Sequence, residues 1–333
     1  MGLGEMWFGT EGRMRWIPAP LAGADVSPQG WGSTGTLLGG GGFAFGSFGS
    51  HKNYQYGWSA ASKAQAASIM QSYASGTYGA GLLYFIDPFT YRRNILPAHW
   101  ADPSLALRGM PPLIRTYNVT LTGTPTAVWA TNDLPTQSVT YDLALTVAGF
   151  PGHANSLFIP VPPGRKLALG AIYTRTGSGG VYAAPVDAIG RAGAPQLLTE
   201  VSQTATEIAP DIIESGALGV RLWIGKSATG AGTVTLTALT ARIIDGAVAG
   251  GTGYGEGGYG VVPFGGGATI PVGISGPWVA GEGHSGCRFD GRPTYIEHGG
   301  WSGDQAEYAV SLKEVGDWMV ATNIATIADL IRT

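Results

Sequence analysis

The chain has 333 residues, among them 55 glycines and 21 prolines, and a formal net charge of −3. Glycine and proline together reach about twice their usual share, whereas charged residues, at 12%, reach about half of theirs. Because 44% of the residues are hydrophobic, simple disorder is excluded, and the slightly negative charge argues against binding to a nucleic-acid backbone.

The cysteine count and the hydropathy exclude further classes of protein. Cys287 is the one cysteine, so a disulfide within the chain and a zinc site of several cysteines are both excluded. No run of about 18 uncharged apolar residues indicates a membrane span, and the N-terminus lacks the apolar core of a signal peptide. We therefore expect a protein made in a cytoplasm, with a length that suits two domains.

The first 50 residues are rich in aromatic residues and glycine. Three tryptophans fall in this stretch: Trp7, Trp16 and Trp31. They are followed by GGGGFAFGSFGSH at 39–51. Phe43 and Phe45 alternate with small residues until Gly46 interrupts the pattern, which predicts a strand that enters a bend or bulge.

The clearest helical pattern covers 59–75, SAASKAQAASIMQSYAS. Small residues recur there at spacings of three and four, and alanine has the highest helix propensity. Ser59 can cap the start and Gly76 can end the helix. Its small face predicts close packing against a sheet. The apolar run GLLYFIDPF at 81–89 then predicts a buried strand that its proline ends.

From about residue 116 the pattern changes to short β-branched or alternating runs separated by glycine, proline and asparagine. Regularly spaced short strands are typical of an all-β sandwich or barrel. We interpret 116–246 as one jelly-roll-like domain of about eight strands. Jelly rolls often bind sugars on aromatic platforms, and this domain offers four candidate residues for glycan contact: Trp129, Tyr173, Tyr182 and Trp223. The alternative is that these aromatic residues form the sandwich core.

Three segments complete the chain. Residues 247–276 are interpreted as a glycine-rich linker. Residues 277–320 contain β-like stretches but are too short to hold a core of their own. We therefore expect them to return to the N-terminal sheet, so that the sandwich is an insertion. The tail 321–333 has helical spacing and is expected to be a helix or a terminal extension.

No constellation in the chain predicts catalysis. The spacing of His284, Cys287 and His298 matches no standard zinc pattern, and a hydrogen-bonded loop is the preferred interpretation. The stretch GGTGYGEGGYG lacks the strand and helix that a nucleotide site needs. A glycosidase needs two carboxylates across a cleft, and the acidic residues are scattered apart from a group at 200–214. We expect no enzyme, no cofactor and no metal.

Two stretches carry a resemblance. One is GTYGAGLLYFIDPFTYRRNILPAHWADP at 76–103, with FAFGSFGSHKNYQYGW before it, and the other closes with SLKEVGDWM within 278–318. Together they resemble the minor or distal tail proteins of long-tailed phages of actinobacteria. FIPVPPGRKLALG and GVRLWIG resemble the inserted carbohydrate-binding-like sandwich of that group. The resemblance follows the chain order over nearly its whole length, except in the linker.

The resemblance implies a mainly β fold and a virion role. Residues 1–115 and 277–320 would form a ring domain with one helix, and the sandwich would lie outside it. The ring, a hexamer rather than a trimer, would join the tail-tube protein to the tail hub and other minor tail proteins. Contact with these neighbours is assigned to five residues: Arg92, Arg93, Trp100, Trp7 and Trp16. A solvated turn is the alternative for the two arginines, and neighbouring subunits would order loops within 7–31.

Three functional classes therefore compete. The first is a structural protein of the phage tail tip, whose outer domain is either purely architectural, the preferred interpretation, or a contact for host glycans. The second is a receptor-binding or carbohydrate-binding tail module. The third is a cell-wall enzyme, which the scattered carboxylates disfavour. Low charge favours the first class, because extended protein–protein interfaces are depleted in lysine and glutamate.

Overall fold

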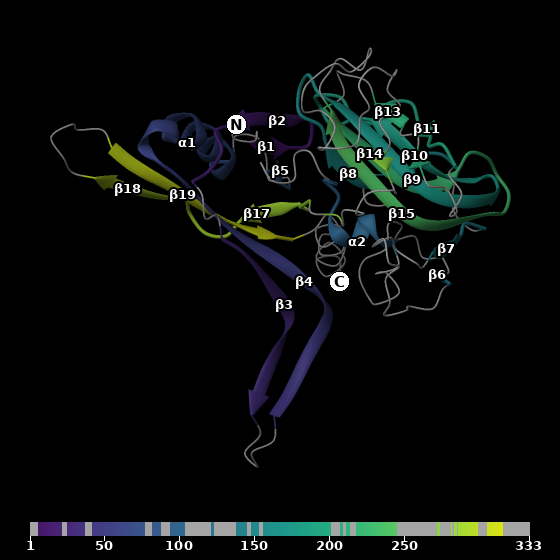
Figure 1. Ribbon diagram of the computed structural model, residues 1–333, viewed down its shortest axis with the longest axis horizontal. Helices are drawn as coiled ribbons and strands as arrows, with labels where there is room; N and C mark the ends of the chain where they lie inside the picture. The colour runs from purple at the N-terminus through teal and green to yellow at the C-terminus, as the bar shows by residue number, and fades with distance from the viewer. Residues whose placement is uncertain are drawn as a thin grey trace, which may run out of the picture.

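The computed structural model of the chain (Figure 1) is mainly β, with several antiparallel sheets and two helices in the part that it describes. The described residues are 6–21, 25–36, 42–76, 82–87, 94–103, 121–122, 138–144, 148–152, 156–200, 207–208, 211–213, 218–244, 272–273, 281, 283–284, 286–298 and 305–315. The predicted fold class is confirmed: a helix-containing β region, completed by C-terminal strands, lies beside a β-sandwich.

A small sheet occupies the centre of the molecule. Its strand order is β2-β1-β5, and its strands are β1 (Met6–Thr10), β2 (Arg13–Ile17) and β5 (Tyr84–Ile86). The turn between β1 and β2 contains Gly12 with a φ of 71°, a conformation that glycine adopts without strain. Strand β2 and all of β1 except Met6 lie within 7–31, where loops ordered by neighbouring subunits were expected, so that expectation was wrong for these two strands.

A larger sheet joins both ends of the sequence. Its strand order is β17-β19-β4-β3, and β18 also pairs with β19. The strands are β3 (Asp25–Thr36), β4 (Gly42–Trp58), β17 (Cys287–Phe289), β18 (Thr294–His298) and β19 (Gln305–Glu314). Because β19 pairs antiparallel with β4 from Tyr308↔Trp58 to Lys313↔Asn53, the C-terminal strands complete the N-terminal sheet as predicted.

The predicted helix is present as α1 (Ala60–Ala74), which packs on β19, β4 and β2. Its buried side chains Ala66, Met70 and Tyr73 join a hydrophobic cluster with strand residues. Ser59 occupies the N-cap position, but its side chain makes no capping hydrogen bond. The helix therefore depends on tertiary packing more than on its cap, as short helices usually do.

The strands β3 and β4 extend far beyond the rest of their sheet (Figure 1). In the described chain, β4 pairs with β19 only over residues 53–58, and its earlier residues pair with β3 alone. The register shifts where Gly30↔Ser50 is followed by Gly32↔Gly46, which confirms the irregularity predicted at Gly46. We call residues 29–36 and 42–51 the arm.

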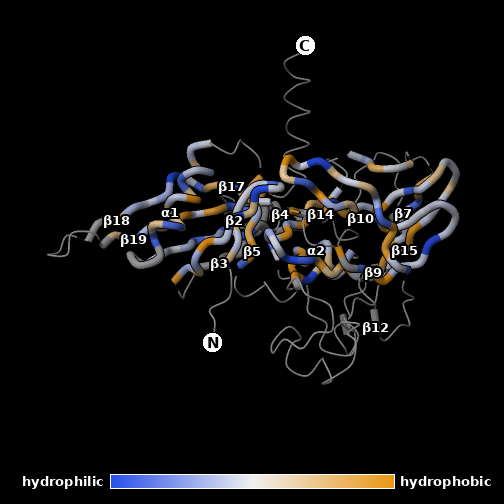
Figure 2. Tube along the Cα trace, turned by 90° about the horizontal axis from the view of Figure 1, so that it is seen from above, coloured by the Kyte–Doolittle hydropathy of each residue, from blue (hydrophilic) through white to orange (hydrophobic). Residues whose placement is uncertain are grey.

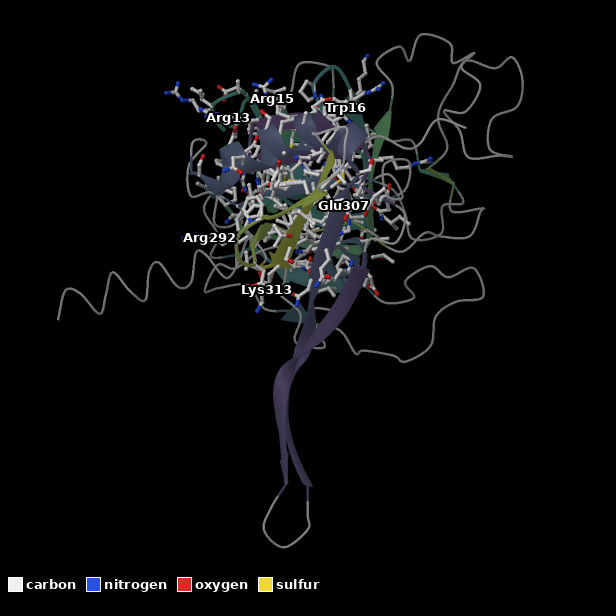
Figure 3. The ribbon with its side chains drawn as sticks, turned by 90° about the vertical axis from the view of Figure 1, so that its left-hand side faces the viewer. Arg13, Arg15, Trp16, Arg292, Glu307 and Lys313 are labelled. Atoms are coloured by element: carbon white, nitrogen blue, oxygen red, sulfur yellow. The ribbon has the colours of Figure 1, made fainter. Side chains whose placement is uncertain are left out.

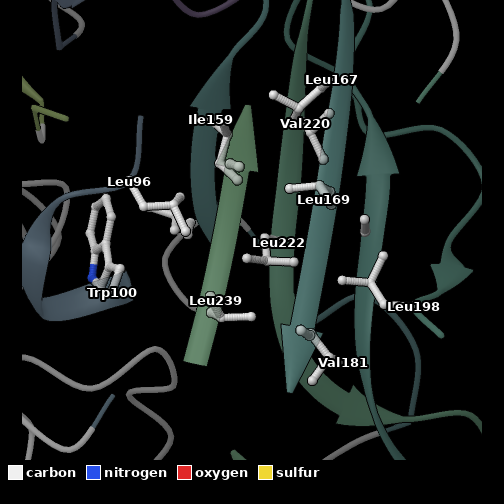
Figure 4. Close-up of a cluster of buried hydrophobic side chains, with 14 of the residues drawn as sticks. Leu96, Trp100, Ile159, Leu167, Leu169, Val181, Leu198, Val220, Leu222 and Leu239 are labelled. Atoms are coloured by element: carbon white, nitrogen blue, oxygen red, sulfur yellow. The ribbon is translucent and has the colours of Figure 1, made fainter. Parts of the chain in front are cut away.

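The sandwich consists of two antiparallel sheets, with strand orders β11-β10-β14-β8 and β13-β9-β15-β7-β6. The strands of the first sheet are β8 (Leu157–Pro160), β10 (Gly179–Pro185), β11 (Gln196–Leu197) and β14 (Gly219–Lys226). The strands of the second are β6 (Leu121–Thr122), β7 (Val139–Asp142), β9 (Lys166–Gly177), β13 (Asp211–Ile213) and β15 (Gly232–Ile244). Apolar side chains of both sheets fill the space between them (Figure 4).

Two further features lie outside these sheets. Strand β12 (Glu207–Ile208) pairs with β16 (Val272–Gly273), so two residues of the predicted linker form a strand. The short helix α2 (Ala98–Ala101) follows Pro97, which occupies its N-cap position. The predicted helix at 321–333 and the rest of the linker lie outside the described residues.

The two halves of the molecule meet at β5, whose side chains alternate between two cores. Leu83 and Phe85 belong to the cluster beneath α1, whereas Tyr84 and Ile86 belong to the sandwich cluster. Figure 2 shows hydrophobic stretches on β5 and α2 at this junction. The ring of Tyr84 meets the ring of Phe158 edge-on, with centroids 4.6 Å apart. The small central sheet is therefore packed on both faces.

Candidate interaction surfaces

The arm is the first candidate surface. From Val26 to His51 the sequence contains no aspartate, glutamate, lysine or arginine. Protein edge strands usually carry charges that prevent pairing with other chains. A two-stranded ribbon without further layers is also marginally stable in water. A long, uncharged arm therefore has the composition of a segment that is covered in an assembly.

The large sheet offers a second strand edge. In the described part of the chain, β3 lies at one end of the sheet, while β17 and β18 share the other end through β19. On β18, Tyr295 and Ile296 are each about half exposed, at 53% and 52%. They point to opposite faces because they are neighbours on a strand. The ammonium of Lys63 lies 3.8 Å from the centroid of the Tyr295 ring.

A third candidate lies on β2, an edge strand of the small sheet. Arg13, Arg15 and Trp16 are exposed there, and Figure 3 shows them at the end of the molecule opposite to the arm. The cross-strand partner of Trp16 is Trp7, which packs against the sandwich cluster. Of these two predicted contact residues, Trp16 presents an open indole, whereas Trp7 is half-buried within its own chain.

The predicted contact role of Trp100 is not supported by its position. Its side chain is 5% exposed and lies beside Leu96 at the margin of the sandwich core (Figure 4). An indole with so little exposed surface packs the two halves of this chain together rather than a neighbour. The predicted contact residues Arg92 and Arg93 lie outside the described residues.

The segment around Asn94 joins the sandwich to the C-terminal segment. The buried Asn94 side chain donates to the Leu239 carbonyl of β15 at 3.2 Å and accepts from the Ala241 amide at 3.1 Å. The amide of Gly283 donates to the Leu96 carbonyl at 3.0 Å. A Cβ on Gly283 would lie 1.6 Å from the Ile95 carbonyl oxygen, so only glycine allows this approach.

An ion pair fixes the other side of the junction. Arg221 of β14 donates through Nε to Glu11 Oε1 at 3.1 Å and through Nη2 to Glu11 Oε2. The side chains are 6% and 23% exposed. Charge-assisted bidentate pairs of this kind are strong and directional. Because Glu11 lies in the β1–β2 turn, the pair attaches the small sheet to the sandwich.

A buried polar cluster lies next to β4 of the large sheet. The sequence did not indicate which of its residues contact one another. His284 Nε2 lies 2.6 Å from Asp87 Oδ2, and Nδ1 lies 2.9 Å from Tyr54 Oη. The Phe85 ring stacks on the imidazole at 4.2 Å. Asp87 follows β5 directly, and its carboxylate holds the His284 imidazole. The contacts join β4, the end of β5 and the segment before β17.

This cluster contains neighbouring titratable groups but no arrangement for metal binding. In the described chain, no group of three histidine, cysteine or acidic side chains could hold a metal ion. Burial, with contributions from Glu314 and Cys287, raises the pKa of Tyr54 far above its ordinary value of 10.0. The tyrosine therefore stays protonated and acts as a hydrogen-bonding group in the core.

The candidate glycan residues are placed mostly in the interior. Tyr173 is fully buried and donates its hydroxyl to the Leu198 carbonyl at 2.6 Å, so it is a core residue and offers no face to an external ligand. Tyr182 and Trp223 are 7% and 1% exposed and stack at 5.9 Å with an interplanar angle of 20°. The expectation of an exposed aromatic platform is therefore wrong for this conformation. Trp129 lies outside the described residues.

In the acidic group at 200–214, the described side chains of Glu200 and Asp211 are engaged in local structure. Asp211 accepts from the amide and hydroxyl of Thr199, at 2.6 and 3.0 Å. Glu200 accepts from Arg175, with 3.4 Å between Oε2 and Nε. These contacts fix loops on the outside of the sandwich. No helix among the described residues is long and apolar enough to cross a membrane.

Comparisons with protein-family profiles and with curated proteins found no match. Among solved structures, the CBM22-1 xylan-binding domain of Paenibacillus barcinonensis Xyn10C aligns with 40% of this chain and 85% of its own, at 10% identity and a TM-score of 0.25. The tandem CBM22-1–CBM22-2 domain of the same protein aligns with 58% of this chain and 54% of its own, at 10% identity and a TM-score of 0.25. The enzymatically active domain of tailspike protein 4 from bacteriophage CBA120 aligns with 45% and 21%, at 17% identity and a TM-score of 0.25. Likeness at this level carries no argument about the function of this chain.

Proposed function

We propose that this chain is a structural protein of a phage tail tip, made in the host cytoplasm and assembled into the virion. Copies of the chain form a closed ring, of six subunits rather than three, that joins the tail-tube protein to the tail hub and other minor tail proteins. The sandwich lies at the outside of the ring, where it contacts host glycans. The proposal assigns the chain no reaction, cofactor or metal.

The arm carries this proposal. It is a long ribbon without charged residues, and in the described chain its two strands pair only with each other. The sheet to which it belongs ends on the other side in β18, which presents Tyr295 and Ile296. Two different surfaces at opposite ends of one sheet favour a head-to-tail contact, which closes into a ring when the rotation between copies allows it.

The rigid junction between the two halves supports the position of the sandwich. Asn94, the Arg221–Glu11 pair and the shared packing at β5 attach it to the central sheet at three points. A domain fixed in this way keeps one orientation in an assembly. This agrees with an outer domain that projects at a defined angle.

The mass of the purified full chain, measured by light scattering together with negative-stain images, tests the proposal. A closed ring of six 34.3 kDa subunits, about 206 kDa, is the expected result. A trimer would favour a hub or receptor-binding role. A monomer that stays monomeric when the purified tail-tube and hub proteins are added would overturn the ring assignment.

The second candidate function is a carbohydrate-binding tail module without a ring. One observation favours it: Tyr182 and Trp223 do form a stacked aromatic pair, although it is covered. Such a module would bind neutral polysaccharide as a monomer, so the mass measurement separates the two candidates.

A further inference from the structure

The outer face of the first sandwich sheet carries an unusual arrangement of side chains. On β10 and β14, alternate residues such as Val181 and Leu222 point into the sandwich core. Tyr182 and Trp223, one position along each strand, therefore lie on the opposite face. They are direct cross-strand partners and stack on each other, and they form a cluster separate from the core.

Next to this aromatic pair lies a pair of glycines. Gly180 and Gly225 are also cross-strand partners, two residues from the aromatic pair on the same face. A Cβ on Gly180 would lie 2.4 Å from Leu197 Cδ1 on β11 and 3.2 Å from the Tyr182 hydroxyl oxygen, and a Cβ on Gly225 would lie 3.0 Å from Trp223 Nε1. The polar edges of both rings therefore lean over the glycines. We call these four residues the aromatic–glycine patch.

The two polar atoms of the patch are buried without a partner. Among the described residues, neither the Tyr182 hydroxyl nor Trp223 Nε1 makes a hydrogen bond. Buried donors in native proteins are nearly always paired, because an unpaired buried polar group is costly. Two unpaired groups that converge over one pair of glycines indicate that a polar ligand completes them.

A short segment covers the patch. Phe150 is half-buried and meets the Trp223 ring edge-on at 5.1 Å, with an interplanar angle of 72°. On either side of Phe150 and Pro151 lie Gly149 and Gly152, both with positive φ, at 91° and 87°. The Gly149 amide donates to the Lys226 carbonyl at 2.9 Å, which holds one end of the segment to β14. Phe150 thus occupies the face of Trp223 that a ligand ring would use.

We propose that the aromatic–glycine patch is a binding site for a neutral pyranose unit of a polysaccharide, which displaces Phe150 from Trp223. The apolar C–H face of the sugar stacks on the indole, and its hydroxyls pair with Tyr182 Oη and Trp223 Nε1. The neighbouring cations are already engaged, because Arg221 pairs with Glu11 and Lys226 Nζ donates to the Ala144 and Gly230 carbonyls. The site therefore favours a neutral sugar over an acidic one.

This inference rests on the outer-domain part of the proposed function and not on ring formation. Native affinity electrophoresis of the full chain, with dextran, mannan or galactan cast in the gel, tests it. We expect retardation of the wild-type chain by at least one of these neutral polysaccharides. Phe150→Ala removes the competing ring and lowers the Kd about three- to tenfold, the size of an aromatic pair contact. Trp223→Phe keeps the packing, loses the N–H and weakens binding about tenfold.

The control is Ile189→Ala, which removes an exposed apolar side chain elsewhere on the sandwich and leaves retardation unchanged. Circular dichroism of each variant verifies folding. The proposal is overturned if neither the wild-type chain nor folded Phe150→Ala is retarded, if only an acidic polysaccharide such as alginate retards them, or if Trp223→Phe binds as the wild type does. The mass of the same samples, measured by light scattering, reports ring formation separately, so a failure of the sugar site is distinguishable from a failure of the ring.

Discussion

The arm and the sandwich have similar compositions, but their strands are packed differently. Both are β-structures rich in glycine and aromatic side chains. The sandwich strands have a second sheet to cover their inner face, and even Trp223 on the outer face is 1% exposed because Phe150 and Tyr182 pack against it. The arm has two strands and no second layer in the described chain. The difference shows that strands of similar composition form a closed core only where another layer packs against them.

The strongest test of this comparison removes the arm. Replacing residues 30–50 by Asn-Gly joins Gln29 and His51, which are strand partners, through a two-residue hairpin turn. We expect ring formation to be abolished, since our proposal places the assembly contact on the arm, while the thermal midpoint of the sandwich stays unchanged. Light scattering and calorimetry measure the two effects. An intact ring in this variant would show that the arm is dispensable.

The junction between the two regions is expected to be the most sensitive point for stability. Gly283→Ala places a Cβ 1.6 Å from the Ile95 carbonyl oxygen, and we expect a loss of about 3 kcal/mol in the free energy of unfolding. Gly57→Ala on β4 is the matched control, because nothing lies within 4 Å of its added Cβ. Urea unfolding of both variants measures the difference, and equal stabilities would contradict the close approach.

The Arg221–Glu11 ion pair tests how much electrostatics contributes to the junction between the small sheet and the sandwich. Arg221→Met leaves Glu11 partly buried beside the sandwich, and we expect a loss of about 2 to 3 kcal/mol. The control is Arg175→Met, whose pair with Glu200 has side chains 33% and 40% exposed and should cost less than about 1 kcal/mol. If the two substitutions cost the same, the junction pair adds no more than a surface pair.

The smallest expected effect is a loss of stability at alkaline pH that arises in the sandwich core. Burial raises the pKa of Tyr173 from 10.0 to about 12, with a smaller opposing effect from Arg175. Since the unfolded chain releases this proton first, stability is complete below pH 10 and is lost as the pH rises towards 12. In thermal melts, Tyr173→Phe should reduce the fall of the midpoint between about pH 10 and 12. Other buried tyrosines still contribute to the fall that is left. A profile identical to that of the wild type would remove Tyr173 as a contributor.

Much of the fold could be predicted because its signals are local. The alanine-rich run marked α1, the apolar run ended by Asp87 marked β5, and the alternation broken at Gly46 marked the irregular β4. The regular spacing of short runs predicted the sandwich. Each of these signals depends on propensity and periodicity within about 15 residues, which sequence alone contains.

The placement of the candidate contact residues was predicted less well, because burial depends on residues far away in the chain. Trp100 was expected to face a neighbour and lies in the junction instead. Phe150, which covers Trp223, was not singled out, although the sequence Gly149-Phe150-Pro151-Gly152 marks an aromatic residue between turn formers. Glu11 gave no signal at all, since its partner Arg221 lies 210 residues later.

By itself, the sequence determined the mainly β class, the helix, the insertion of the sandwich between strands of one sheet, and the absence of charge in the arm. The tertiary structure alone decided which aromatic residues are covered and which stay open. A side chain on a strand has two faces available, and the choice between core, junction and surface is made by the layer that packs against it. For this protein, the pairing of β19 with β4 and the placing of β5 between two cores made that choice.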